Sequence, residues 1–149
     1  MLITGVAAIC GMSHGEQQVR AAITECPDYI KLISYVVHSE EKLREYSSNT
    51  LWNVCDGGKE AVKEEIAKAG IVHHAGSMLE DSVRSKHIKL FRLKYKQVFA
   101  VRVNACGILM HLADGHPERQ ALIGLTEAPS LLAQCVNVDA KVSAAGKTG

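Results

Sequence analysis

Hydrophobic positions along the chain recur every three or four residues, which is the spacing that places side chains on one face of a helix. Leu109 and Leu112 follow this spacing up to a closing glycine, Gly115. The segment from Glu60 to Ala69 is rich in charge and carries Ile66 as its inward apolar position. Long alternation of β-branched residues is mostly missing, so the pattern predicts an all-α protein.

The apolar positions also occur in units that repeat along the chain. GEQQV, which starts at Gly15, corresponds to GKEAV, which starts at Gly58, at an offset of 43 residues, and a third copy runs through Gly115. TECP at 24–27 recurs as TEAP at 126–129. In each unit a glycine is expected to end one helix as a left-handed cap, a charged helix follows, and a more apolar helix comes next. In the first unit that apolar helix would bury Tyr29, Ile30, Leu32, Ile33, Val36 and Val37.

None of these units can bury its apolar face alone, so the repeat predicts that the units stack into a solenoid. The second and third glycines are 57 residues apart instead of 43, which indicates an insertion at about 84–98 in the second unit. The apolar stretch from Met1 to Gly11 has no basic flank, and we expect a buried helix there instead of a signal peptide. No apolar run is long enough to span a membrane.

Two segments resemble the armadillo repeat, in which a helix ends in a small-residue glycine motif and a later alanine–glycine pair follows. They are LWNVCDGGKEAVKEEIAKAGIV and ACGILMHLADGHPERQALIGLTEAPSLLAQCV, and AAICGMSHGEQQVRAAITECPDYIKLI is similar more loosely. The HEAT repeat is the near alternative, with a similar period but without this signature. The resemblance implies one right-handed α-solenoid domain over 1–149, with about three repeats and boundaries near 26–28, 70–71 and 128–129. We expect either a segment of a longer solenoid or a small protein that associates through exposed ends.

The resemblance also implies a function, because peptide-binding members of the family hold an extended ligand along the concave face of the third helices. Asn53 matches the position of the asparagine that clamps the ligand backbone, and an amide can both donate and accept hydrogen bonds. His111 fills that position in the third unit and Gly11 in the first, and the family's tryptophan position is Asn49. The expected function is therefore a non-catalytic adaptor or scaffold that holds a protein segment near Asn53, Lys59 and His111. The alternative for Asn53 is a helix-end side chain that satisfies local backbone groups.

Net charge is +1, but the charges are unevenly distributed along the chain. Between positions 83 and 103 there are seven basic residues and no acidic one, whereas the rest of the chain has ten basic and sixteen acidic residues. This segment, 84–102, supports an alternative function, a regulatory module that docks on an acidic partner or an anionic membrane. Nucleic acid is a less favoured partner because the remaining chain is acidic. The expected contacts are Arg84, Lys86, Lys89, Arg92, Lys94 and Lys96.

Candidate catalytic groups gather around Cys55, where a thiol, an acid and two glycines are adjacent. Equivalent positions in the other units hold small residues, so we interpret Cys55 as a buried structural thiol. Gly57 and Gly58 lack the lysine and the strand of a phosphate loop. His73 and His74, being adjacent, point in different directions on a helix, so one should face inward and one outward. We therefore predict no enzyme activity, no metal and no cofactor.

The cysteine pattern bears on the compartment of the protein. There are five cysteines, an odd number, with no CxxC pair. This usage favours reduced thiols in an intracellular, cytoplasmic protein, with the nucleus as the alternative.

Overall fold

The computed structural model describes the backbone of residues 1–84 and 92–136, and the side chains of these ranges except those of 81–84 and 92–98. All regular structure within these ranges is helical, so the predicted all-α class is confirmed. No described helix is both long enough and apolar enough to cross a membrane. In chain order the elements are α1 (Leu2–Ser13), α2 (Gln17–Glu25), the 3₁₀ helix η1 (Pro27–Lys31), α3 (Leu32–Tyr35), α4 (Glu41–Cys55), α5 (Glu60–Lys68), α6 (Ile71–Arg84), α7 (Arg92–Ala113) and α8 (Pro117–Gly124), and residues 128–136 are also helical.

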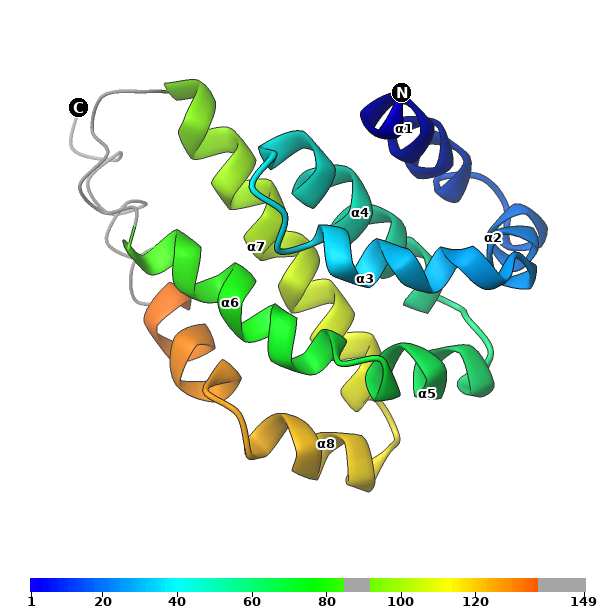
Figure 1. The fold of residues 1–149 in the computed structure, drawn as a ribbon. Coiled ribbons are helices and arrows are strands. Elements are labelled where there is room, and N and C mark those ends of the chain that lie inside the picture. The colour runs from blue at the N-terminus through cyan, green and yellow to red at the C-terminus, as the bar shows by residue number, and fades with distance from the viewer. Residues whose placement is uncertain (85–91, 137–149) are drawn as a thin grey trace.

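Helices α1, α4 and α7 form the frame of the molecule. Helix α4 packs against α1 on one side and against α7 on the other (Figure 1). Helix α3 packs on α4, and α6 packs on α7, so these two helices cover one side of the frame. The core between these layers contains fully buried Leu51, Ile66, Leu79 and Ile108. Ile66 therefore faces inward as predicted, and Leu109 and Leu112 are buried as well.

The residues at the helix ends explain where several helices begin and end. Pro27 and Pro117 occupy first turns, where a missing backbone N–H costs no helical hydrogen bond. Gly115 has φ of 69°, the left-handed conformation expected for the cap after a long helix. In the second unit, however, the positive φ of 72° belongs to Gly57 and not to Gly58, and the prediction fails for Gly15, whose φ is not positive. Gly58 is required sterically instead, because a Cβ there would lie 2.2 Å from the carbonyl oxygen of Val54.

Close packing between α4 and α7 depends on a second glycine. The indole of Trp52 lies against Gly107, where an added Cβ would be 2.4 Å from Cε2 of the ring. Glycine is thus the residue that lets this tryptophan lie between the two helices.

Two predictions about buried helices need correction. Only Val6, Cys10 and Ser13 of α1 are buried, and Leu2 and Ile3 are exposed, so the N-terminal segment is a half-covered helix. The apolar helix after Pro27 begins as a 3₁₀ turn and continues as α3. It buries Tyr29, Leu32, Ile33 and Val36 but leaves Ile30 half-buried and Val37 exposed, since the chain turns away after Val36 towards α4.

Helix junctions lie at the three positions suggested as repeat boundaries, at 26–28, 70–71 and 128–129. The segment suggested as an insertion between two helices, 84–98, is divided by the fold. Helix α7 begins at Arg92 and has 22 residues, against 15 for α4, so the backbone of 92–98 forms the first turns of α7. Residues 92–98 thus belong to a helix, and residues 85–91 lie outside the described part.

Candidate functional site

Asn53 belongs to a network of polar side chains that links α1, α4 and α7. Its Nδ2 donates to Ser13 Oγ of α1 at 3.0 Å and to Asn49 Oδ1 of its own helix at 3.2 Å. Asn49 Nδ2 in turn donates to Asn104 Oδ1 of α7 at 3.4 Å. The two donor hydrogens of Asn53 are thus used inside the protein. No donor among the described residues is bonded to its Oδ1.

The α7 side of this network is buried. Asn104 Nδ2 donates to Ser48 Oγ at 2.9 Å and to the Glu45 carbonyl at 3.4 Å. On the α1 side, Cys10 Sγ lies 3.4 Å from Asn49 Oδ1. Buried amides must be paired, so these bonds fix the register of α1, α4 and α7. Sequence reasoning did not identify Ser13, Ser48 and Asn104 as members of a network, since their partners are 40 or more residues away.

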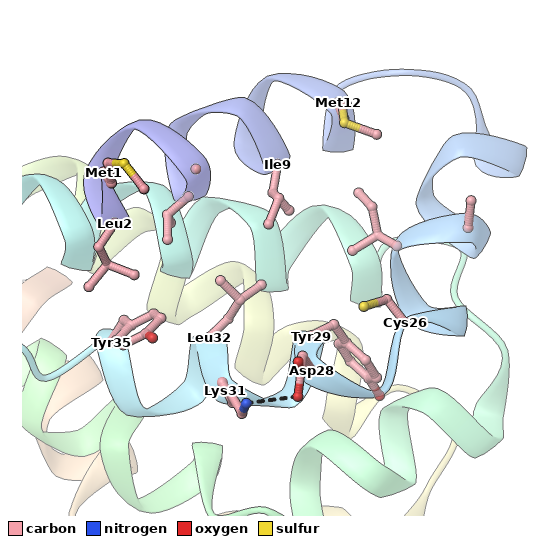
Figure 2. A pocket seen from close by; sticks show the side chains of 14 residues that line it. Met1, Leu2, Ile9, Met12, Cys26, Asp28, Tyr29, Lys31, Leu32 and Tyr35 are labelled. Carbon is pink, nitrogen blue, oxygen red and sulfur yellow. Dashed lines mark ion pairs between the residues drawn. The ribbon is translucent and has the colours of Figure 1, made fainter.

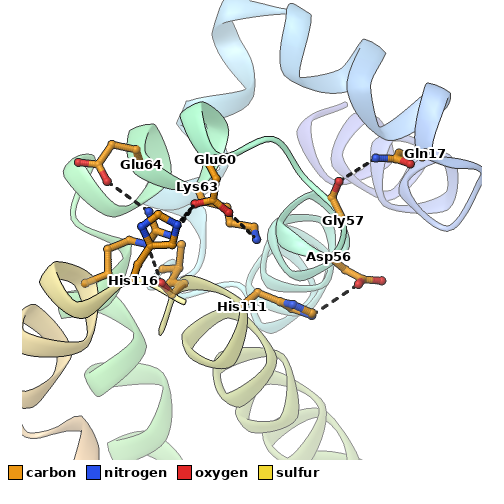
Figure 3. Close-up of polar contacts among 10 residues, drawn as sticks. Gln17, Asp56, Gly57, Glu60, Lys63, Glu64, His111 and His116 are labelled. Atoms are coloured by element: carbon orange, nitrogen blue, oxygen red, sulfur yellow. Dashed lines mark hydrogen bonds and ion pairs between the residues drawn. The ribbon is translucent and has the colours of Figure 1, made fainter. Parts of the chain in front are cut away.

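His111 lies near the end of α4, beside the loop that follows it (Figure 3). Its Nε2 is 3.8 Å from Asp56 Oδ1, and Asp56 Oδ2 forms an ion pair with Arg20 at 3.1 Å. Arg20 also donates from Nε to the Ser13 carbonyl at 3.1 Å and from NH1 to the Asn53 carbonyl at 3.3 Å. This arginine therefore joins the carboxyl ends of α1 and α4.

Lys59 is exposed at the N-terminus of α5. It lines a small cleft of about 70 Å³ between α2 and the loop after α4, together with Arg20 and Asp56. Neither Asn53 nor His111 lines this cleft. The fold thus places Asn53, Lys59 and His111, three of the nine residues predicted to bind a partner, around the end of α4, with Lys59 on the α2 side.

Basic residues predicted as contacts cannot be placed in the site. Lys86 and Lys89 lie outside the described residues, and Arg84, Arg92, Lys94 and Lys96 are described only by their helical backbone.

An apolar stripe on α7 was not predicted from the sequence. Met110, Phe99 and Val103 are 58%, 44% and 36% exposed. They recur at helical spacing on the face opposite the buried Ala105 and Leu112. This α7 stripe is an exposed apolar surface on a long helix, a feature typical of contact sites when it is contiguous. Its signal was present in the sequence, but only the fold decides which face of α7 is covered.

A second polar cluster joins α5 to α8 (Figure 3). Glu60 Oε2 accepts from Arg119 at 2.7 Å and lies 2.6 Å from His116 Nε2, and Glu64 accepts from Arg119 at 3.4 Å. The buried Arg119 guanidinium, which also bonds the Leu112 carbonyl, holds the pKa of Glu60 below its usual value. Lys68, and then Arg119, lower the pKa of Glu64.

Thiol and imidazole groups give little support for catalysis. Cys55 is fully buried, as predicted, and burial raises its pKa to about 12, so its thiolate is disfavoured at neutral pH. Burial also raises the pKa of Cys10. His73 is exposed and His74 is half-buried. This is close to the prediction that one of the two faces outward and the other inward. Among the described residues no group of three or more His, Cys, Asp or Glu side chains could hold a metal ion.

The described residues thus define an all-helical protein with a polar network across three adjacent helices and an apolar stripe beside it. No known protein family matches the chain, and neither curated proteins nor solved structures gave a match.

Proposed function

We propose that the chain is a right-handed solenoid of about three armadillo-type repeats. Adjacent packing of α1, α4 and α7 supports this architecture, as does the packing of α3 on α4 and of α6 on α7. Side-chain contacts also repeat: Arg20 donates to the Ser13 carbonyl, and Gln120 donates to the Ala113 carbonyl, seven residues back in both cases. Arg20 and Gln120 are 100 residues apart, and so are Ser13 and Ala113. Gly15 and Gly115 have the same separation.

The function that this architecture favours is a non-catalytic adaptor that binds a segment of a partner protein on the face of α4 and α7. One observation carries the proposal: the α7 stripe of Phe99, Val103 and Met110 is uncovered among the described residues. The polar network of Asn49 and Asn53 on α4 lies on the neighbouring helix. An apolar anchor beside amide groups suits a peptide, because the side chains of the peptide can pack on the anchor and its backbone groups can bond to the amides.

Partner capture from the native source tests this proposal. Wild-type protein is compared with Met110→Asp, in the stripe, and with Val37→Asp, an exposed apolar position away from it. Captured proteins identified by mass spectrometry should be reduced at least about tenfold for Met110→Asp, because a carboxylate would be desolvated in the contact. The Val37→Asp control should capture the same proteins as wild type. Equal capture by all three forms would refute a partner site on α7.

The Asn53 hypothesis is tested with the same assay. Asn53→Ala removes the free acceptor but also two internal hydrogen bonds. Asn53→Asp keeps an acceptor and lacks the donor hydrogens. Capture that is lost with alanine and retained with aspartate would support an acceptor role, after both variants are shown to keep wild-type helix content by circular dichroism. Capture unchanged by both would leave Asn53 as a purely structural residue.

The basic segment supports a second candidate, docking on an acidic partner or an anionic membrane. Deleting 84–96 would be a poor test, because it removes the first turns of α7. A cleaner test replaces four lysines with glutamine, namely Lys86, Lys89, Lys94 and Lys96. Binding to vesicles of phosphatidylserine and phosphatidylcholine, or to the captured partner, should then fall and lose its salt dependence. Unchanged binding would exclude this candidate.

A further inference from the structure

An apolar pocket of about 470 Å³, the α1 pocket, lies between α1 and the segment formed by η1 and α3 (Figure 2). Ile9 and Met12 of α1 line one side of it, and Leu32 and Tyr35 of α3 line the other. All of its lining residues belong to the described part of the chain. Helices α1 and α3 are not packed closely on each other, so the pocket is the space that separates them.

Charges at the α1 pocket do not select a charged occupant. Asp28 and Lys31, the charged residues in the lining, form an ion pair with each other at 2.8 Å. Helix α1 contains no Asp, Glu, Lys or Arg, although its Leu2 and Met12 are 48% and 53% exposed. An uncharged helix beside a pocket whose charges are already paired favours an occupant that presents apolar side chains.

The covering layer of the fold indicates the shape of that occupant. Helix α3 packs on α4, and α6 packs on α7, whereas α1 packs chiefly against α4 and α2. No described helix takes the corresponding place beside α1. Because the α1 pocket is bordered by both α1 and α3, it lies where the next helix of the covering layer would pack in the proposed three-repeat architecture.

Helix α6 shows which side chains such a helix needs. Its Ile71, Ala75 and Met78 are buried at positions i, i+4 and i+7, which lie on one face of a helix. Helix α3 likewise buries Leu32 and Val36. Helix α1 has 12 residues and is about 18 Å long, so an occupant of about three turns would match its length.

We propose that the α1 pocket docks a helix of about three turns from a partner protein, through an apolar stripe like that of α6. An amphipathic helix in an apolar groove is a recurring mode of peptide recognition. The inference rests on the repeat architecture proposed above and adds a second site, because Phe99, Val103 and Met110 of the α7 stripe do not line the pocket. The chain would then hold a helical segment at α1 and another segment at α7, as a scaffold does.

A peptide of residues 70–80 is the probe, because α6 fills on α7 the place that is open beside α1. A hydrocarbon staple between His73 and Ser77 keeps the peptide helical, and both positions are exposed in the fold and lie outside the stripe. Fluorescence anisotropy of the labelled peptide should show saturable binding to the full chain. The same peptide carrying Met78→Glu should bind at least about tenfold more weakly, since a carboxylate would be buried without a partner.

Two protein variants place the binding in the pocket. Met12→Glu puts a charge in the lining, and Val37→Glu puts one at an exposed apolar position outside it. Peptide affinity should fall at least about tenfold for Met12→Glu and stay at the wild-type value for Val37→Glu. Circular dichroism checks that both variants keep their helix content. No binding of the stapled peptide, or equal binding by all three proteins, would overturn the proposal.

Other occupants of the pocket give different results. A wild-type dimer that Met12→Glu dissociates, seen by sedimentation velocity, would place a second copy of the chain in the pocket and overturn the proposal. Binding of oleate that Met12→Glu abolishes, without binding of the stapled peptide, would make the pocket a small-molecule site and overturn it as well.

Met110→Asp separates this inference from the proposed adaptor function. Met110 lies on the α7 stripe and not in the pocket, so this variant should bind the stapled peptide like wild type. Peptide binding in the pocket, with partner capture unaffected by Met110→Asp, would leave the helix site standing and remove the adaptor function at α7. Capture that is lost in Met110→Asp, without peptide binding to any form of the protein, would do the reverse.

Discussion

Replacing Gly107 with alanine tests the packing between α4 and α7. The added Cβ would lie 2.4 Å from Cε2, 2.5 Å from Nε1 and 2.6 Å from Cδ2 of Trp52. Carbon atoms in good contact are about 3.5–4.0 Å apart, so the indole must move by roughly 1 Å or more. Overpacking of this kind costs about 1–3 kcal/mol. Alanine in a helix recovers about 1 kcal/mol relative to glycine, so the net loss is about 0–2 kcal/mol.

Gly76→Ala is the matched control for this substitution. Gly76 lies inside α6, and an added Cβ there would meet nothing within 4 Å. This variant should gain up to about 1 kcal/mol, so the difference between the two variants isolates the clash at about 1–3 kcal/mol. Urea unfolding followed by circular dichroism measures both free energies of unfolding.

The tryptophan itself provides two further readouts. Trp52 is the only tryptophan in the chain, so a red shift of its emission in Gly107→Ala would report its displacement towards water. In a Trp52→Ala background the clash is gone, and Gly107→Ala should then stabilise the protein, as Gly76→Ala does. A double-mutant cycle with no coupling between positions 52 and 107 would refute the packing described for these helices.

Adjacent serines in α4 should respond in opposite directions to alanine. Ser47 Oγ is buried with no hydrogen-bond partner among the described residues, so Ser47→Ala should stabilise the fold by about 1 kcal/mol. Ser48→Ala removes a partner of Asn104 and should destabilise it by about 1–2 kcal/mol. Urea unfolding of both variants checks this, and equal effects would contradict it. Acid should weaken the contact of Glu60 with Arg119: the pKa of Glu60 is lowered in the folded state, so its stabilisation is present above the unfolded pKa near 4.5 and is lost as pH falls through the folded pKa. Glu60→Gln should therefore show a smaller fall in melting temperature between pH 6 and pH 3 than wild type, and parallel curves would show that the ion pair does not contribute.

Sequence periodicity alone determined that the chain is helical and where several helices meet. Helical spacing of apolar residues identified the inward positions of Ile66 and Leu112, because a helix face is a local property of the chain. Local chemistry also predicted the glycine cap at Gly115. It failed at Gly15, although the loops that hold Gly15 and Gly115 are equally long, and at Gly58, where the neighbouring Gly57 takes the left-handed conformation instead.

Tertiary structure decided what the polar and exposed residues do. Asn53 was singled out from the sequence, but its bond to Ser13 joins residues 40 positions apart, and only the packing of α1 on α4 brings them together. Arg119 and Glu60 are also far apart in the sequence, and tertiary packing brings them together. Equally, sequence spacing places Met110 and Val136 each on an apolar face of its own helix. It does not show whether another helix covers that face. Coverage is set by which helices pack together, and that arrangement leaves the α7 stripe and the α1 pocket open among the described residues.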